Sequence, residues 1–467
     1  MTIIKHITLI LLLGIMGVSG YGQTISDALR YAVLTPQGTA RVAGVGGSFG
    51  AMGGDIGVMS INPAGLAGFY KSEFTFTPTI TSTNTEAFLV EDSANVSTQS
   101  KTNFGLSNMA AVFVSRPSSG KWQTSNFTIG YQKVADLNKA FLYRGITVGS
   151  YSESLEEVPS VIFDVPYQNA SLSKEQIVSQ KGYVSELNFG WAGSYDNKLD
   201  IGISLGIPFV SFDEEKTYSE EDAINALNVF NKYDRENYLN VSGAGINFKA
   251  GFIYKGIKPL RIGASIHSPN YYTLTEDFGE SDEYTFDNDD TDALASDGRF
   301  KYQYKTPWKV NSSVGVLYNL GNIKGFANAD LEFLDYSSSN FDLGAYSTEL
   351  EDINYGLELN KEIESELGSI VNLRLGTELA YRKIRLRLGT GLLQSPYSND
   401  AGEGEYSSTY SFGVGLREND FYLDLSYARN SNEEGYIAYD PNEGDNIPLA
   451  NTETSKGVIQ FTAGFKF

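Results

Sequence analysis

The chain contains no cysteine, only two histidines, and no apolar run of the length that a membrane-spanning helix needs. Without cysteine it forms no disulfide, has no thiol nucleophile and offers no thiolate to a metal. A spanning helix requires about 20 consecutive apolar residues. A chain of this kind can therefore cross a membrane only as a closed β-barrel, because lipid leaves every other backbone arrangement with unpaired polar groups.

Basic side chains are also scarce. The 35 Lys and Arg residues stand against 57 Asp and Glu residues, for a net charge of −22. Such a balance repels nucleic acid, which we exclude as a partner. Glycine and aromatic residues are plentiful, with 48 Gly, 30 Tyr and 27 Phe. This composition suits the tilted strands and aromatic girdles of a membrane barrel.

The N-terminus has the pattern of a secretory signal peptide. Lys5 precedes an apolar run over residues 7–18, and small residues follow at Gly20 and Gly22. A charge, a short apolar core and a small-residue cleavage site together predict removal of residues 1–22. We therefore expect the mature protein to work in the cell envelope.

Alternation of apolar and polar residues dominates the remainder. In the last segment Ile459, Phe461, Phe465 and Phe467 share one face, and this apolar strand with a terminal aromatic resembles the signal read by the barrel-assembly machinery. Alternation places one set of side chains toward lipid and the other toward the lumen. The pattern predicts an all-β fold, a fourteen-stranded antiparallel transmembrane β-barrel. Its strands are expected near 73–83, 105–116, 126–136, 184–196, 199–212, 241–255, 259–271, 305–320, 323–337, 369–382, 384–397, 406–417, 420–430 and 457–467.

The connections are alternately short and long, as in barrels with periplasmic turns and outer loops. Long loops are expected at 137–183, 213–240, 272–304 and 338–368. Residues 276–297 hold ten carboxylates, which could bind calcium or a lipopolysaccharide-bridging cation, but we favour a simply solvated acidic loop. Residues 353–367 predict an amphipathic helix over the mouth, with contacts through Leu357, Ile363 and Leu367.

Residues 23–72, called the hatch below, lack strand alternation and are rich in glycine. Glycine allows tight bends and close backbone packing. Asn62 and Pro63 favour a turn, because proline fixes its φ and asparagine can bond its own backbone. We expect the hatch to fold inside the barrel formed by residues 73–467.

The hatch resembles that of the FadL-type outer-membrane transporters of long-chain fatty acids and other hydrophobic compounds. The resemblance rests on Asn62-Pro63-Ala64 and on the glycine run that ends in Gly53-Gly54-Asp55. It implies a Gram-negative outer-membrane channel, surrounded by lipid and lipopolysaccharide, for passive uptake of hydrophobic small molecules. In this family ligand passes a pocket above the hatch, and a gap in the third strand makes a lateral exit. Gly130 is the candidate for that gap.

The same resemblance leaves a second function open, since the family includes a subunit of a protein-secretion apparatus. The alternative is thus a barrel that docks protein partners. For lumen-facing Arg374, Arg385 and Arg387 we weigh carboxylate recognition against a salt-bridged network and favour the network. Ser265 and His267 share a face of one strand, but a hydrogen-bonded lumen histidine is the better interpretation. We predict no enzyme activity, no cofactor and no metal site.

Overall fold

The computed structural model describes residues 23–33, 38–118, 120–148, 171–222, 230–288, 290–398, 406–437 and 449–467. The predicted signal peptide lies outside the described residues. Among them, no helix has both the length and the apolar character needed to span a bilayer.

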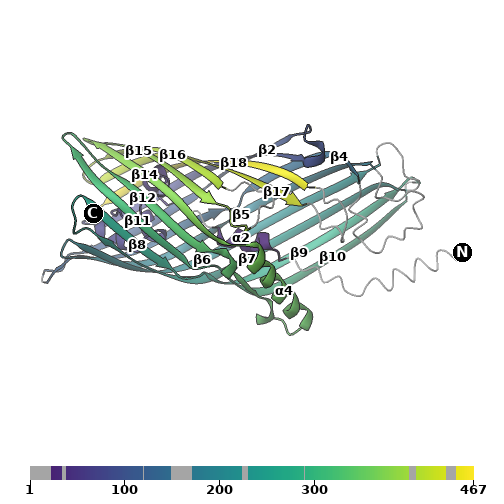
Figure 1. The fold of residues 1–467 in the computed structure, drawn as a ribbon, viewed down its shortest axis with the longest axis horizontal. Helices are drawn as coiled ribbons and strands as arrows, with labels where there is room; N and C mark the ends of the chain where they lie inside the picture. Colours follow the sequence, from purple (N-terminus) through teal and green to yellow (C-terminus); the bar gives the residue numbers. More distant parts are fainter. Residues whose placement is uncertain are drawn as a thin grey trace.

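The described strands form one closed antiparallel barrel (Figure 1). The described residues contain eighteen strands, but four barrel strands are each interrupted and appear as two consecutive segments: β3 with β4, β8 with β9, β10 with β11, and β12 with β13. The barrel therefore has fourteen strands. Pairing of the last strand with the first closes the cylinder. The predicted fold class is confirmed. The strands are β1 Glu73–Leu89, β2 Ser97–Ser115, β3 Trp122–Asp136, β4 Lys139–Val148, β5 Ser171–Tyr195, β6 Leu199–Glu221, β7 Phe230–Tyr254, β8 Leu260–His267, β9 Tyr271–Phe286, β10 Thr291–Lys305, β11 Lys309–Leu320, β12 Ile323–Asp335, β13 Asn340–Asp342, β14 Ser369–Tyr381, β15 Ile384–Gln394, β16 Tyr406–Arg417, β17 Phe421–Ile437 and β18 Leu449–Lys466.

Several strands are much longer than the sequence predicts. Large parts of the expected loops at 137–183, 213–240 and 272–304 are strands, and the acidic segment 276–297 is most of the β9–β10 hairpin. These outer halves carry polar residues on both faces because they stand in water beyond the membrane. Hydropathy alternation therefore ends where the lipid ends, although the hydrogen-bonded ladder continues.

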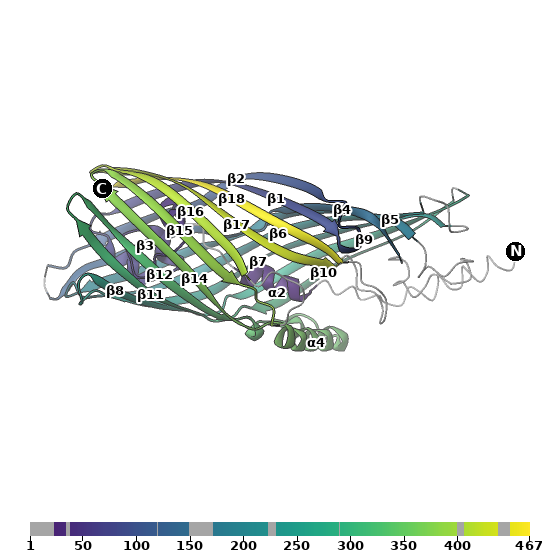
Figure 2. The same ribbon diagram turned by 45° about the horizontal axis from the view of Figure 1, so that its top comes forward.

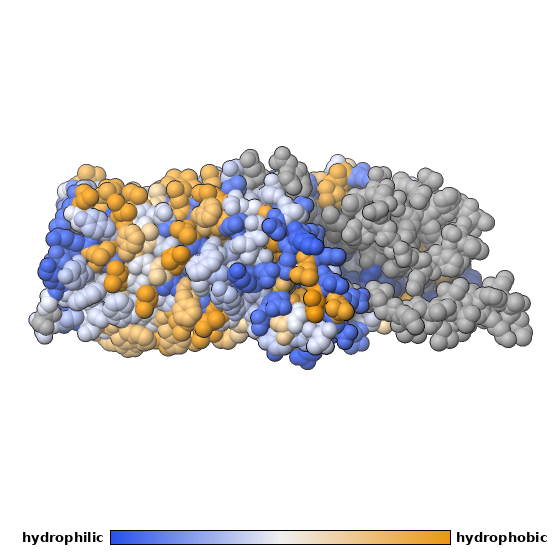
Figure 3. Space-filling model, turned by 60° about the horizontal axis from the view of Figure 1, so that its bottom comes forward, coloured by the Kyte–Doolittle hydropathy of each residue, from blue (hydrophilic) through white to orange (hydrophobic). Residues whose placement is uncertain are grey.

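Exposed apolar side chains form a belt on the half of the strands next to the short turns, and Figure 3 shows one face of this belt. Outward-facing Leu386, Leu388, Phe461 and Phe465 are 42–61% exposed, as expected of side chains that meet lipid. The parity predicted for the last strand is thus confirmed. On β7 and β9 the belt ends near Ile246, beyond which outward positions become polar.

Three helices and five short 3₁₀ turns complete the described structure. Helix α4 lies beside the strands at the outer rim in both ribbon views and not across the mouth (Figures 1 and 2). Its buried residues include Leu359 and Ile363, whereas Leu357, one of the predicted contacts, is 55% exposed. The elements are α2 Ile25–Ala32, α3 Ala40–Gly44, η1 Ile56–Ser60, η2 Pro63–Gly68, η3 Val90–Asp92, η6 Tyr336–Ser338, η7 Leu343–Ala345 and α4 Leu350–Glu366.

Candidate functional site: a filled lumen and a break in the wall

The hatch packs against inward-facing positions of the wall. Turn η2 contacts β5, β6 and β7, while helix α3 contacts the strands from β15 to β18. Glycines of the wall face the hatch backbone: a Cβ on Gly202 would lie 2.5 Å from the carbonyl carbon of Pro63, and one on Gly389 would lie 2.1 Å from that of Val45. Real side chains do not fit at such distances. The wall is therefore built without side chains where the hatch backbone touches it.

Asn62, Pro63 and Ala64 form the tight turn that opens η2. The side-chain oxygen of Asn62 accepts from the Ala64 N–H at 3.1 Å, and Pro63 occupies the first turn, where a missing N–H costs nothing. The Asn62 amide donates to the carbonyl of Gly50 at 2.8 Å and to that of Phe252 at 3.1 Å. One side chain thus joins two hatch turns to each other and to β7.

Gly53, Gly54 and Asp55 make the neighbouring turn. Gly54 has a φ of +69°, a conformation that side chains rarely adopt, and Gly53 lies against Gly65. The Asp55 carboxylate caps η1 through the Gly57 N–H at 3.0 Å and accepts from the Thr39 hydroxyl. These residues hold the hatch compact, and none of them lines the large cavity described below.

A chain of ion pairs connects the hatch to the wall below that cavity. Arg41 of α3 forks onto the Glu378 carboxylate with two contacts of 2.9 and 3.0 Å. Arg387 contacts the same carboxylate at 2.7 Å and Asp424 at 2.8 Å, and Arg417 pairs with Asp424. Arg387 is nearly inaccessible to solvent. Its role in the structure is to connect two carboxylates inside the wall.

The other two arginines of the predicted set are placed differently. Arg374 lines the cavity, but its guanidinium pairs with Glu332 at 2.9 Å. Arg385 donates to main-chain carbonyls of Arg382 and Ile384 near the short turns. The structure therefore does not bring the three together. The salt-bridged interpretation fits this geometry better than recognition of a ligand carboxylate, which stays a prediction.

Ser265 and His267 face the lumen, as their parity predicts, and both are buried. Their side chains lie 3.4 Å apart, and each also contacts the carbonyl of Ile61, at 2.7 Å from the serine hydroxyl and 3.0 Å from the imidazole. The carbonyl accepts from the serine. This arrangement anchors the hatch, because the hydroxyl is committed to a main-chain acceptor and covered by it.

Metal binding finds no support in the described residues, among which no three His, Asp or Glu side chains are grouped closely enough to hold an ion. The acidic residues of the β9–β10 hairpin that are described lie spread along two strands.

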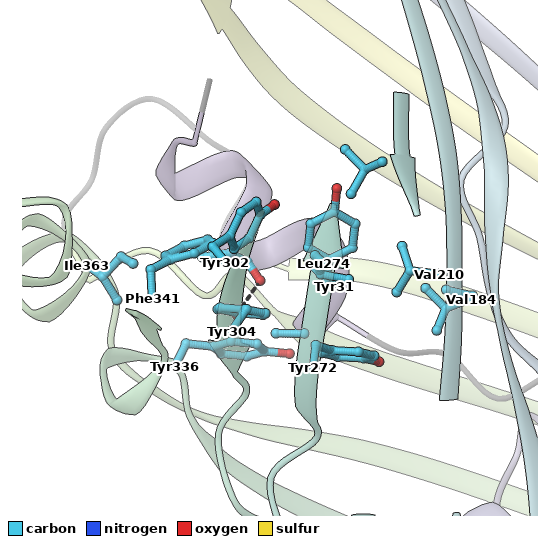
Figure 4. Packing of buried hydrophobic residues seen from close by; sticks show 14 of the residues in the cluster. Tyr31, Val184, Val210, Tyr272, Leu274, Tyr302, Tyr304, Tyr336, Phe341 and Ile363 are labelled. Atoms are coloured by element: carbon cyan, nitrogen blue, oxygen red, sulfur yellow. Dashed lines mark hydrogen bonds between the residues drawn. The ribbon is translucent and has the colours of Figure 1, made fainter. Parts of the chain in front are cut away.

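Helix α2 lies in the lumen nearer the outer ends of the strands than the remainder of the hatch does, and packs against a cluster of aromatic side chains (Figure 4). Tyr304 of β10 donates to the carbonyl of Ala28 at 2.6 Å, and its ring stacks near those of Tyr272 and Phe341. Tyr31 of the helix meets Tyr304 edge to face. Sequence reasoning missed this cluster, because tyrosines that face a wet lumen and tyrosines of an aromatic girdle look alike in sequence.

A cavity of about 1390 Å³ occupies the lumen between the hatch and the outer strands. Its floor includes Gly46, Gly47 and Ile61 of the hatch, and α2 forms part of its side. Aromatic rings and charged side chains both contribute to its walls. The size exceeds the roughly 300–1,000 Å³ typical of small-molecule sites, so a ligand with a long chain fits.

The wall is interrupted between β2 and β3. Their ladder covers only the pairs from Asn108–Gln132 to Ser115–Ser125, so residues 97–107 of β2 have no partner on that edge among the described strands. The register of β3 shifts between Lys133 and Ala135. The predicted site of the irregularity, Gly130, is wrong: Gly130 is paired regularly on both sides and packs against Met59 of the hatch.

Beyond this shift the chain turns into the lumen. Strand β4 pairs with β5 alone and passes behind β1, where Thr83 donates to the Asn138 carbonyl. It reaches β17, with Lys139 contacting Glu434 at 2.7 Å and the rings of Phe141 and Tyr436 4.9 Å apart. Figures 1 and 2 place β4 beside the outer ends of β2 and β5. Because β4 does not pair with β2, residues 97–107 of β2 keep one edge without a ladder partner among the described strands.

Asp136 sits at the bend. It contacts Lys133 at 2.8 Å and accepts from the Asn138 N–H, while Lys456 of β18 donates to its carbonyl. Residues 135–139 also line the cavity. The break in the wall and the cavity therefore share residues. The run Asp136-Leu137-Asn138 is the only sequence signal that could have located the bend, since it places polar turn formers where a strand should continue.

No family model matches this chain, and no characterised sequence is significantly similar to it. Solved structures are similar in fold. The Pseudomonas putida toluene transporter TodX matches with a TM-score of 0.58 at 12% identity, over 93% of this chain and 100% of that one. A Pseudomonas aeruginosa FadL homologue matches with a TM-score of 0.60 at 10% identity, over 93% and 100%. The Ralstonia pickettii toluene transporter TbuX gives 0.54 at 15% identity, over 92% and 99%.

Together with the strand pairing, these comparisons define the class of protein first: a fourteen-stranded antiparallel β-barrel. More narrowly, the chain has the fold of the FadL-type transporters, and the predicted resemblance is confirmed at that level.

Proposed function

We propose that this protein is an outer-membrane channel for passive entry of hydrophobic small molecules, fatty acids among them. The observation that carries the proposal is the cavity of about 1390 Å³ that extends from the outer strands to residues 135–139 at the bend of β3. A hydrophobic solute could collect there above the hatch. Similar solved structures include toluene transporters, which supports a hydrophobic cargo.

The exit we propose is lateral. Hydrogen-bonded strands seal a barrel wall, and along residues 97–107 of β2 that seal is missing among the described strands, next to the bend whose residues 135–139 line the cavity. Gly105 and the exposed Phe104 lie on this edge, level with the apolar belt. A ligand leaving here would enter lipid without crossing the periplasmic turns. The hatch, tied to the wall by Asn62 and Arg41, would then act as a fixed floor.

A cross-linking experiment tests this route. The ammonium of Lys101 on β2 lies 3.4 Å from the hydroxyl of Ser179 on β5, so these side chains face each other across the break. In the cysteine-free chain, Lys101→Cys with Ser179→Cys can be joined by a short bis-maleimide. Uptake of radiolabelled toluene and of a labelled long-chain fatty acid by cells producing the protein should fall at least fivefold after joining.

The matched control is Ser179→Cys with Glu215→Cys, because these residues are already partners in the β5–β6 ladder. Joining them should leave uptake unchanged. If uptake of both tracers persists with the break joined, the lateral route is wrong. If neither tracer enters faster than in cells without the protein, the transport function itself is wrong.

A second function is favoured by one observation, the outer edge of β10. This strand pairs with β9 over its whole length but with β13 only from Gln303 to Lys305, which leaves residues 291–302 with an edge unpaired among the described strands. Such an edge can add a strand from a partner. Native mass spectrometry after mild-detergent purification separates the two functions: a retained hydrophobic ligand supports transport, and a stoichiometric protein partner supports docking.

A further inference from the structure

We infer that the cavity selects uncharged hydrophobic ligands over carboxylates. The inference rests on the proposed function and narrows its cargo: fatty acids, whose head group is charged, would bind less well than uncharged hydrophobic molecules. Among the described residues that line the cavity, carboxylates outnumber cationic side chains by ten to seven. The local charge therefore has the same sign as a fatty-acid head group and opposes its entry.

Ion pairing acts in the same direction, because each cationic side chain among the described lining residues already contacts a carboxylate of the protein. Lys139 lies 2.7 Å from Glu434, and Lys216 lies 3.0 Å from Glu214. A ligand carboxylate that bound either lysine would displace this partner or share the ammonium with it. In both cases two carboxylates would lie side by side in the cavity, and like charges so close repel strongly away from bulk water.

The remaining lining suits an uncharged molecule. The rings of Phe141, Phe212 and Phe300 supply apolar surface, and amides such as those of Gln176 and Gln394 can bond a hydroxyl. The guanidinium of Arg30 lies over the ring of Phe212 at 4.1 Å and pairs with Asp27. Its charge is thus already satisfied from two directions. An alcohol or an aromatic hydrocarbon needs no ion pair to be broken.

The test compares two ligands of equal chain length. The purified full-length protein in a nonionic detergent is incubated at pH 8 with equal amounts of hexadecanol and hexadecanoate. Bound ligand is extracted after repurification and quantified by mass spectrometry, with protein-free micelles as the reference. We expect at least a tenfold excess of alcohol over acid relative to the micelles. An acid content equal to or above the micelle ratio would overturn the selectivity.

Three variants distinguish the effect of removing an ion-pair partner from the effect of changing the net charge of the cavity. Glu434→Gln leaves Lys139 without its carboxylate and should raise the share of bound acid at least fivefold, and Glu214→Gln should do the same through Lys216. Glu433→Gln changes the net charge equally but frees no cation, and should stay within twofold of the unaltered protein. Equal shifts in all three variants would refute the pairing argument. Retained hexadecanol shows that a variant is folded.

The outcomes also distinguish this inference from the function on which it rests. Acid bound as well as alcohol overturns the selectivity alone and leaves transport standing. If the unaltered protein retains neither ligand, the proposed function fails and the inference fails with it.

Discussion

The side-chain amide of Asn62 donates a hydrogen bond to the main-chain carbonyl of Phe252, over 3.1 Å, and so joins the hatch to β7. The same amide donates to the carbonyl of Gly50 at 2.8 Å. Asn62 itself is 2% exposed, which means that water cannot replace the contact without a rearrangement. This buried amide is therefore one of the contacts that fix the floor of the cavity to the wall.

Replacing Asn62 by alanine should loosen that floor. Each buried acceptor that loses its donor costs about 1–3 kcal/mol. We expect a lower urea midpoint for the variant in lipid vesicles and faster leakage of small sugars through reconstituted protein. Asn319→Ala, on an exposed position of β11, is the control and should change neither. If vesicles with the Asn62 variant leak no more sugar and its urea unfolding midpoint is unchanged, the amide does not hold the hatch.

The contact between Gly202 and η2 gives a steric counterpart. A methyl group there would meet the main chain of Pro63 and Ala64 at 2.5–2.6 Å, closer than atoms can approach. Gly202→Ala should therefore displace the hatch and destabilise the protein by about 1–3 kcal/mol, the usual cost of overpacking. Gly391→Ala is the matched control, since its nearest neighbours lie at an ordinary 3.6 Å. Equal unfolding midpoints for the two variants would contradict the close packing of hatch and wall.

The two halves of the barrel differ in how well the sequence predicts them. Within the lipid belt one face of each strand must be apolar, so fourteen segments and their parity could be located. The inner face of β2 is apolar as well, because Ala110 and Val112 pack on the hatch cluster around Met59. Alternation alone therefore does not set the register of β2. Outside the belt the outward face is also polar, so hydropathy alternation is weak and segments such as residues 232–240 of β7 look like loops in sequence.

The site is predicted less completely than the fold. The Asn-Pro-Ala turn carries its own local signal, as capping and proline geometry are encoded within a few residues. The bend at Asp136 depends instead on Lys456, which is 320 residues away in sequence and contacts its carbonyl at 2.7 Å. Which carboxylate neutralises Arg374 or Arg387 is likewise a property of the closed barrel. Such partners are chosen by strand order and register, and no short motif encodes them.

Glu378 gives a prediction about the ionic chain between hatch and wall. Its carboxylate contacts both Arg41 and Arg387, so Glu378→Ala leaves two largely buried guanidinium groups without this partner. Breaking a buried pair in this way costs about 3–5 kcal/mol. Chemical unfolding in vesicles should show a correspondingly lower stability.

An exposed pair supplies the control for that measurement. Glu418 contacts Lys383 at 2.7 Å at the short turns, where both side chains are open to water. Glu418→Ala should cost no more than about 1 kcal/mol, as surface pairs do. If both variants lose the same stability, the buried chain contributes no more than a surface pair and does not anchor the hatch.

The last prediction concerns how pH affects the docking of helix α2 in the lumen. Glu276 lies on β9 beyond the apolar belt, between the outward polar residues Thr275 and Asp277, and its own side chain points inward. It contacts Gln23 at 3.2 Å and Tyr302 at 3.3 Å. Burial, with a smaller contribution from the charge of Asp27, raises the pKa of the Glu276 carboxyl from 4.5 to about 7.

The raised pKa sets the direction of the pH dependence. Below pH 4.5 the Glu276 carboxyl is protonated whether or not α2 is docked in the lumen. Between pH 4.5 and about 7 the carboxyl ionises more readily when it is exposed to water. The docking of α2 in the lumen therefore becomes progressively less stable, by up to about 3 kcal/mol above pH 7. We expect a spin label at Val33→Cys, the only cysteine in that variant, to become more mobile as pH rises from 5 to 8. With Glu276→Gln the label should show the same mobility throughout this range. A label that stays immobile at pH 8 with Glu276 present would mean that the ionised carboxylate is accommodated without moving the helix.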